Sequence, residues 1–304
     1  MKTLDIVIPS KNSGEELLST IKFWLTQKIP NGWQIKVYLI DDGSTDGSVA
    51  NLKSLINDKR LSIIHNPVSL GRSKAINQGA NIGTGEYISF FDADCTPVND
   101  KVLYPVVQSI LNQNPAIIFG KLIATGNDFW NQYFNEVSRK RELNFLKGNP
   151  FALTTAHLTI RRSIFEAISG FDERYTHYGF EDRDLLIRAY KKESHFTFQP
   201  HSIVNHIDKL TLEVVCKKMM IAGQTTSKLF KKSHPKEYQE MAFSKVDYDE
   251  LNILTKIPLL FLSQIILKLT PLLNKILKSQ SPYRIKKIIV KCSSACAFLI
   301  GSSN

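Results

Sequence analysis

Cysteine is scarce in this chain of 304 residues, and none of its cysteines has the spacing of a zinc or redox motif. The four positions contain no Cys-x-x-Cys pair and no histidine-rich ligand spacing, so we expect no structural zinc site. They are Cys95, Cys216, Cys292 and Cys296. A reducing, cytosolic compartment suits such thiols best. We expect Cys95 to be a small packed side chain rather than a reactive one.

The chain also lacks motifs that would assign a function at once. Asp5 and Pro9 stand where a signal peptide would need its apolar core, so secretion through a cleaved signal is not expected. No G-x-G-x-x-G follows the first strand-like stretch and no G-x-x-x-x-G-K-[ST] occurs, so neither a dinucleotide site nor a Walker loop is supported. Apolar, charged, glycine and proline contents are ordinary, which is typical of a globular protein.

Acidic residues are nearly absent from the end of the chain. Residues 209–304 hold sixteen of the 39 lysines and arginines but only six of the 28 acidic residues, a net charge of +10. We therefore expect a nearly neutral domain at 1–208 and a basic helical region at 209–304. The excess charge indicates an anionic partner surface. Because no aromatic-interleaved basic motif accompanies it, we expect a membrane surface and no nucleic acid.

Short apolar runs alternate with amphipathic stretches in the first hundred residues. Strand-like runs lie at 4–8, 35–40, 61–64 and 87–91, and helix-like segments lie near 14–27, 46–57 and 71–82. This alternation predicts an α/β fold with a largely parallel sheet. Farther on, the sequence predicts a strand at 116–119, paired short strands around 152–160 and 195–206, a helix opened by Glu181, and helices alone beyond Asp208.

Polar residues follow these predicted strands. They include Asn12 after the first strand, Asp41 and Asp42 after the second, and Asp92 and Asp94 after the fourth. Ligands of open α/β sheets bind outside the carboxyl ends of the strands, so we expect these loops to form one crevice that suits a nucleotide. A carboxylate after a strand also caps a turn or a helix, which is the alternative interpretation.

Two carboxylates one residue apart offer more than a cap. Mg²⁺ and Mn²⁺ take oxygen ligands and are typically held by one or two carboxylates together with phosphate oxygens. Asp92 and Asp94 therefore predict a divalent cation site that would neutralise the diphosphate of a leaving nucleotide.

The motifs, in their order, resemble a family 2 glycosyltransferase of the GT-A fold over roughly residues 4–208. They are VIPSKN at 7–12, DDGSTD at 41–46, GRSKAINQGA at 71–80 and GEYISFFDAD at 85–94. GFDE at 170–173 and YGFEDRDL at 178–185 resemble the acceptor-side region of galactosyltransferase-like and chondroitin-polymerase-like enzymes. The resemblance implies a mixed, mostly parallel sheet flanked by helices, with a helical C-terminal extension. Lys11 departs from the family, which often has an aromatic residue there.

For the donor, the resemblance implies a nucleoside pocket and a nearby diphosphate site. Pro9, Ser10 and Asn12 would line the pocket, and Asp42 would contact the base. Arg72 and Lys74 would face the diphosphate, where a cation helps it to leave.

For the metal and the acceptor, the resemblance implies four further roles. Asp92 would lie near ribose and metal, and Asp94 would bind the metal directly. His206 would complete the metal shell, with His201 as the second choice, although a lone histidine near a strand end is also a common structural residue. Asp182 would be the general base and Glu181 would hold the acceptor, whereas a helix N-terminus explains the same pair equally well from spacing alone.

These implications together predict an inverting, metal-dependent hexosyltransferase. It would move a sugar from a nucleotide-diphosphate sugar, with UDP favoured, to a glycan or lipid-linked acceptor in cell-surface glycan or glycolipid biosynthesis. One alternative is a catalytically inactive binding module with the same fold. The other is a nucleotidyltransferase of similar fold, which would carry a Gly-rich basic loop in place of Pro9-Ser10-Lys11-Asn12.

The basic region contains an apolar helix at 256–278 with a narrow cationic stripe. Lys268 lies in its middle and Pro258 and Pro271 flank it, so it is too interrupted to span a bilayer. It is either a core helix or an interfacial helix. We favour the interfacial one, at the inner face of the cell membrane, because a second basic cluster from Arg284 to Lys291 follows it.

Overall fold

Eight strands form one sheet in the computed structural model, which describes residues 1–207 and 210–304. The strands are β1 (Lys2–Ser10), β2 (Trp33–Asp42), β3 (Leu61–Asn66), β4 (Tyr87–Phe91), β5 (Cys95–Pro97), β6 (Ile117–Ile123), β7 (His157–Arg161) and β8 (Phe196–His206). Their order is β3-β2-β1-β4-β7-β6-β8-β5. The first four strands are parallel, whereas β7 is antiparallel to both β4 and β6. β8 is parallel to β6, and β5 is antiparallel to β8.

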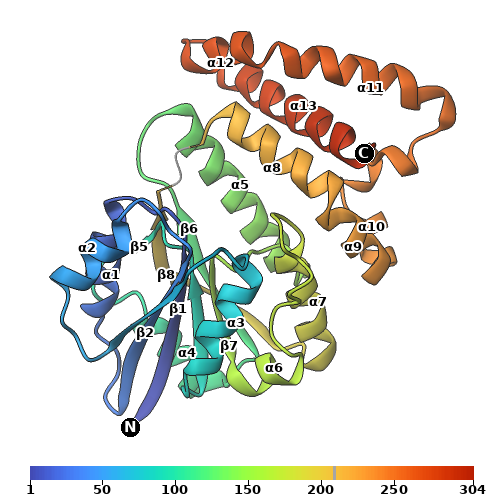
Figure 1. Cartoon of the computed structure of the whole chain (residues 1–304). Helices are drawn as coiled ribbons and strands as arrows, with labels where there is room; N and C mark the ends of the chain where they lie inside the picture. The colour runs from blue at the N-terminus through green and yellow to red at the C-terminus, as the bar shows by residue number, and fades with distance from the viewer. Residues whose placement is uncertain (208–209) are drawn as a thin grey trace. The chain divides into compact units, whose positions relative to one another are not determined.

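Helices cover both faces of this sheet (Figure 1). One face packs on α1 (Glu16–Leu25), α2 (Ser48–Leu55) and α4 (Tyr104–Gln113). The other packs on α3 (Arg72–Ile82), α6 (Arg162–Ala167) and α7 (Glu181–Lys192). Burial on both faces explains why the strands are continuous apolar runs. In β4, for example, Phe91 contributes to the first core and Phe90 to the second.

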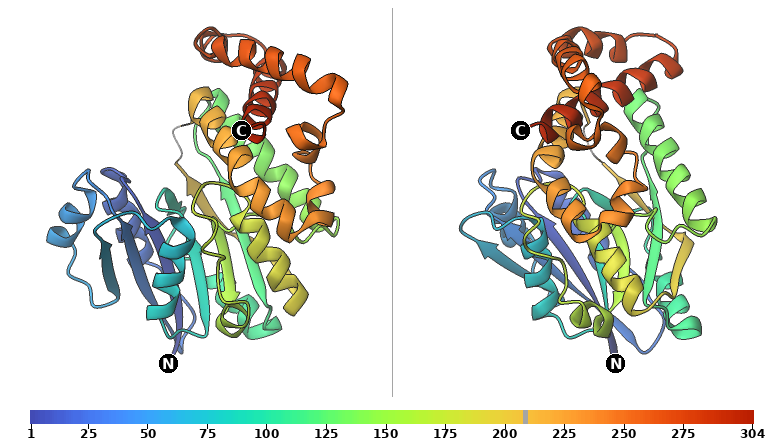
Figure 2. Two further views of the ribbon diagram at one scale, coloured as in Figure 1. Left: turned by 45° about the vertical axis from the view of Figure 1, so that its right-hand side comes forward. Right: turned by 90° about the vertical axis from the view of Figure 1, so that its right-hand side faces the viewer.

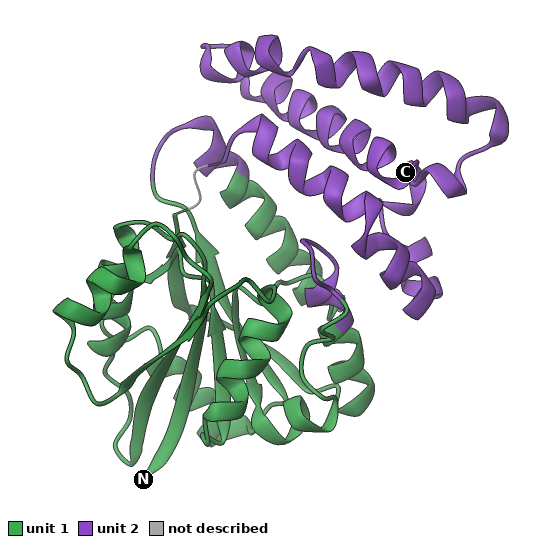
Figure 3. Ribbon diagram, viewed as in Figure 1, with its two compact units in different colours: residues 1–125, 134–174, 185–208 green, residues 126–133, 175–184, 209–304 purple. Residues whose placement is uncertain are grey.

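The chain divides into two compact units (Figure 3). The first comprises 1–125, 134–174 and 185–208 and contains the sheet. The second comprises 126–133, 175–184 and 209–304. The helix α5 (Phe129–Leu146) contributes to both. The domain boundary predicted at Asp208 and Lys209 lies outside the described residues.

The described residues after 209 are helical, as the sequence predicts. The helices are α8 (Leu212–Gln224), α9 (Thr226–Ser233), α10 (Pro235–Gln239), α11 (Ile253–Lys268), α12 (Thr270–Lys278) and α13 (Tyr283–Ser302), with short 3₁₀ turns at Ser244–Val246 and Tyr248–Glu250. Figure 2 shows this set from two further directions. Its core joins Phe129, Leu212 and Cys216 to Leu277, Val290 and Ala297.

Two predictions about elements are wrong in detail. The strands β7 and β8 do not pair with each other, because β6 lies between them. The helix predicted at 256–278 is two helices, α11 and α12, bent by 57° at their junction. Pro258 lies inside α11, and Pro271 is in the first turn of α12 rather than beyond a helix end. Proline has no backbone N–H to donate, and the first turn of a helix leaves its N–H groups without helical acceptors, so a new helix starts there readily.

No single helix in the described parts of the chain has both the length and the apolar composition needed to cross a bilayer. The bent pair α11 and α12 meets those two criteria when its members are taken together.

Candidate active site

The loops after β1 and β2 are locked together by Asn12. Its side-chain Oδ1 accepts a hydrogen bond from the backbone N–H of Thr45 at 2.8 Å. The backbone N–H of Asn12 donates to Ser44 Oγ at 3.0 Å. Asn12 has φ 51°, a left-handed conformation that asparagine tolerates better than most residues. The Gly14 amide donates to Asp46 at 2.9 Å. Asn12 therefore has a structural role in joining the two loops, and its place in a nucleoside pocket stays a prediction.

Asp42 links the end of β2 to the loop before α3. Its carboxylate is nearly buried and accepts three hydrogen bonds, from Ser69 Oγ at 2.6 Å and from the amides of Leu70 at 2.6 Å and Gly71 at 3.1 Å. A carboxylate has about four acceptor positions, so one remains for a ligand. Asp41 is occupied differently, because it accepts from the Ser44 amide and lies 2.7 Å from His65 Nδ1.

Arg72 joins the start of α3 to the acidic segment after β4. Its Nη2 and Nε lie 2.7 and 3.2 Å from Asp92 Oδ1, and both side chains are about 30% exposed. The guanidinium also reaches Thr155 Oγ1 at 3.4 Å and lies over the Phe171 ring. Two predicted donor-site residues are therefore in direct contact. The sequence analysis missed Thr155, which belongs to no motif.

Asp94 lies beside His206 because β5 pairs with β8. Cys95 is opposite His206 in that pairing, and Asp94 Oδ1 is 3.6 Å from His206 Nε2. The Asp94 carbonyl accepts the Ile207 amide at 2.9 Å, which fixes this corner of the sheet. The His206 ring stacks on Phe134, a contact without a sequence signal. His201 is exposed on β8 and has no such place opposite Asp94 or Cys95.

The donor atoms of Asp94, Cys95 and His206 all lie within 4.8 Å of one another. Cys95 is fully buried, and burial together with the Asp92 and Asp94 carboxylates raises the pKa of its thiol well above the ordinary value. It therefore stays protonated, whereas Mg²⁺ and Mn²⁺ prefer hard oxygen and imidazole ligands. Asp94 and His206 are the residues that fit a divalent cation, and Asp92 is engaged with Arg72.

Glu181 and Asp182 begin α7 in the second unit. Glu181 is buried and Asp182 is partly exposed. The preceding Phe180 has φ 70°, a conformation that is strained for an aromatic residue. Its ring packs against Phe230, Phe243 and Phe298 with centroids 5.1 to 6.4 Å away. Residues of the helical region thus hold the turn that presents the predicted acceptor-side pair.

The other predicted donor residues lie near these contacts in sequence. Ser10 is buried and forms a hydrogen bond of 2.8 Å with Ser13 Oγ, whereas Pro9 is partly exposed. Lys74 is exposed on α3, two residues after Arg72.

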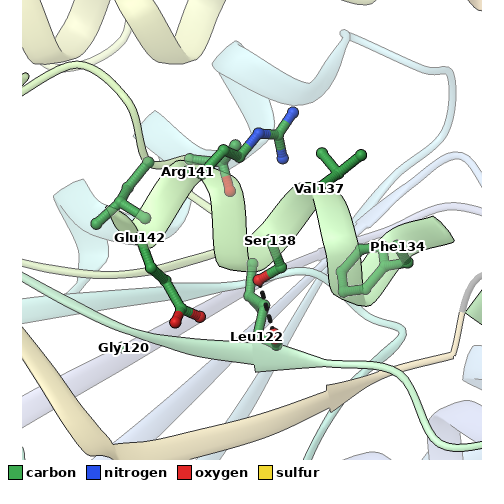
Figure 4. Close-up of a pocket in the computed structure, with 9 residues that line it drawn as sticks. Gly120, Leu122, Phe134, Val137, Ser138, Arg141 and Glu142 are labelled. Carbon is green, nitrogen blue, oxygen red and sulfur yellow. Dashed lines mark hydrogen bonds between the residues drawn. The ribbon is translucent and has the colours of Figure 1, made fainter. Parts of the chain in front are cut away.

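Two cavities in the first unit are not lined by Asp92 or Asp94. A cleft of about 220 Å³ is lined by Asp41, Ser44, Lys53 and His65, among others. A smaller cavity of about 30 Å³ lies between α5 and β6, where Ser138 Oγ donates to the Leu122 carbonyl (Figure 4). It has room for a water molecule and none for a nucleotide.

A family model described as glycosyl transferase family 2 matches residues 5–169, more than half of the chain. The chain belongs to this family. A second model, the N-terminal domain of galactosyltransferase, matches residues 152–210 and covers the acceptor-side motifs.

Curated relatives of this family 2 chain include several bacterial glycosyltransferases. GlyG of Streptococcus pneumoniae is 27% identical over 43% of this chain, and YdaM of Bacillus subtilis is 26% identical over 66%. The chain spans only 42% and 49% of the length of these two relatives. The amylovoran biosynthesis glycosyltransferase AmsB of Erwinia amylovora is 26% identical over 67% of this chain and 69% of its own length.

Solved structures confirm the predicted GT-A fold. The mannosyltransferase PcManGT of Pyrobaculum calidifontis, in complex with GDP-Man and Mn²⁺, has a TM-score of 0.61 at 15% identity over 99% of this chain and 85% of its own. Staphylococcus aureus TarS 1-349 with UDP-GlcNAc has a TM-score of 0.54 at 14% identity, covering 100% of this chain and 91% of its own.

Proposed function

We propose that this chain transfers a sugar from a nucleotide-diphosphate sugar to an acceptor hydroxyl, with inversion and with a divalent cation. The observation that supports this most is the set of contacts at the carboxyl ends of β1, β2 and β4. Asn12, Asp42 and Arg72 each connect one loop of that edge to the next. Ligands of open α/β sheets bind at this edge.

In this proposal Asp94 and His206 hold Mn²⁺ or Mg²⁺. Their donor atoms lie 3.6 Å apart, so Asp94 and His206 would both contact one ion after a small side-chain movement. The ion would supply positive charge at the diphosphate as the sugar leaves. Asp92, in contact with Arg72, would accept from a ribose hydroxyl, and the Arg72 guanidinium would supply positive charge near the diphosphate.

The other residues that we propose for donor binding lie at the same edge of the sheet. Asp42 has one acceptor position left for the base, beside Pro9, Ser10 and Asn12. Lys74 is exposed and adds a mobile cation for the diphosphate. UDP is our choice of nucleotide, supported by the TarS complex with UDP-GlcNAc, whereas the PcManGT complex holds GDP-Man.

Asp182 is the proposed general base and Glu181 the proposed acceptor ligand. Asp182 takes the proton of the acceptor hydroxyl as that oxygen bonds to the anomeric carbon, and the carbon–oxygen bond to the nucleotide diphosphate breaks on the opposite side. No covalent enzyme intermediate is needed. We propose a cell-surface glycan or a lipid-linked glycan as acceptor, handled at the inner face of the membrane, in line with the relative AmsB.

Release of free nucleotide from a panel of UDP- and GDP-sugars with Mn²⁺ tests this function. We expect turnover with at least one donor and a fall of about 10²-fold or more in Asp94→Ala and Asp182→Asn. Asp100→Asn is the control, because Asp100 is a surface carboxylate paired with Lys28. Wild-type protein that releases nucleotide from no donor would leave the inactive binding module as the better description. Release of pyrophosphate from a nucleoside triphosphate would support the nucleotidyltransferase.

A further inference from the structure

The helix α11 is apolar on most sides, and little of it is buried. Of its sixteen residues only Ser263 is buried, and Ser263 forms a side-chain hydrogen bond with Cys296 of α13. Its large apolar residues are exposed instead, including Ile253 at 79%, Leu254 at 81%, Ile257 at 73% and Phe261 at 65%. A helix of a water-soluble core has the opposite arrangement. The exposed apolar residues of α11 are therefore a candidate contact surface.

Most of these residues lie toward one side of α11. Ile253, Ile257, Phe261 and Ile265 recur every four residues, and Leu254 and Leu262 widen this side. Leu269, at the junction with α12, and Leu272, in α12, are also exposed, and we call these eight residues the apolar face. Within the second unit α13 packs against both α8 and α11, so α11 is an outer helix of this unit (Figures 1 and 2).

The segment that carries the apolar face contains cations and no anions, while Glu213 of α8 lies near Lys278 and Glu250 near Lys256. Residues 251–304 contain eight lysines and arginines and no aspartate or glutamate. The exposed ones include Lys268, Lys275, Lys278, Arg284 and Lys291. An apolar helix face bordered by basic residues is typical of helices that lie in the interface of an anionic bilayer.

We propose that α11 and α12 dock this protein on an anionic lipid leaflet, with the apolar face at the level of the acyl chains. This inference rests on the membrane location proposed above and assigns it to named residues. A second copy of the chain suits the face less well, because a symmetric contact would bring the same excess of cations together. A spanning arrangement would place Lys268 within the bilayer, at a cost that the interfacial one avoids.

Co-sedimentation of the full chain with vesicles tests the proposal. Wild type should bind vesicles containing one anionic lipid in three and bind neutral phosphatidylcholine vesicles at least tenfold less, and high salt should weaken the binding. Ile257→Glu/Phe261→Glu should lower binding by about 100-fold or more, because two apolar side chains are lost from the lipid. Lys275→Gln/Lys278→Gln should lower it by about fivefold for each lysine removed.

Leu111→Glu/Leu143→Glu is the matched control, since it adds the same charge at two exposed leucines outside α11–α13 and should bind like wild type. Wild-type protein that stays in the supernatant, or equal binding of Ile257→Glu/Phe261→Glu, would overturn the proposal. A dimer in solution that this variant abolishes would identify a second copy as the occupant. Retention on vesicles after alkaline carbonate extraction would identify a spanning pair.

Nucleotide release is measured in the same samples. Loss of docking with turnover retained would reject the lipid surface and leave glycosyl transfer in place. Docking without turnover would reject the transfer reaction alone.

Discussion

At the scale of single residues, His157 links stability to pH. It is 2% exposed in β7, packs on Phe91 and lies 3.0 Å from Ser202 Oγ. Burial lowers the pKa of His157 from 6.5 to about 4. Between these values the unfolded chain binds a proton that the folded chain does not, so the free energy of unfolding falls as the pH falls. The loss is about 2 kcal/mol at pH 5 and about 3 kcal/mol near pH 4.

Urea denaturation of wild type and His157→Gln at pH 7.5 and pH 5 measures this contribution. The variant is less stable at pH 7.5, but its free energy of unfolding should depend less on pH than that of wild type. His201→Gln removes an exposed histidine of β8 and should keep the wild-type dependence. Equal pH dependence in wild type and His157→Gln would show that His157 is not the group responsible.

The residues of the candidate site differ in how far the sequence could predict them. Asp92 and Asp94 were identifiable because a charged pair interrupts an otherwise buried strand. Their separate partners, Arg72 and His206, were named only through the family resemblance, and their roles stay predictions. The contacts of Thr155 and Phe134 depend on chain segments that meet only in the folded sheet, so no local pattern could indicate them.

At the scale of elements, α8 and α13 approach closely at two glycines. A Cβ atom at Gly301 would collide with the Met220 carbonyl oxygen, and one at Gly223 would lie 2.5 Å from the Phe298 carbonyl oxygen. Gly301→Ala should therefore push the helices apart and lower the free energy of unfolding by about 1 to 3 kcal/mol. Cys292→Ala, at an exposed position of α13, should change it by less than about 0.5 kcal/mol.

The readout is the urea midpoint of each variant, together with nucleotide binding at low temperature. Binding should survive in Gly301→Ala, because the proposed donor residues belong to the first unit. A variant as stable as wild type would show that α8 and α13 can separate at no cost.

Elements were predictable where one periodicity dominates. β1 and β4 were found because strands buried on both faces are mostly apolar, β2 and β3 because their apolar runs are short and β-branched, and α7 because acids open its first turn. β5 was missed because a strand of three residues is too short to show an alternation of apolar and polar side chains. The division of 256–278 into α11 and α12 was missed because apolar residues continue in the sequence on both sides of the bend. The outward orientation of the apolar face was not predictable because it depends on tertiary packing.

At the scale of the whole molecule, the two compact units have different proposed ligands, a nucleotide for the first and a lipid surface for the second. A ligand of one unit can therefore be used to tell the unfolding transitions of the two units apart. Multi-unit chains often depart from two-state unfolding, so scanning calorimetry should resolve more than one transition. UDP with Mn²⁺ at 100 times its dissociation constant adds about 2.7 kcal/mol to whichever unit binds it. It should raise the transition temperature of the first unit, which hydrogen exchange identifies by protection of the loop from Ser69 to Gly71.

Gly301→Ala should lower the transition temperature of the second unit and leave that of the first unit unchanged. If nucleotide and Gly301→Ala move a single common transition, the two units unfold together, and the donor residues depend on the helical region for their stability.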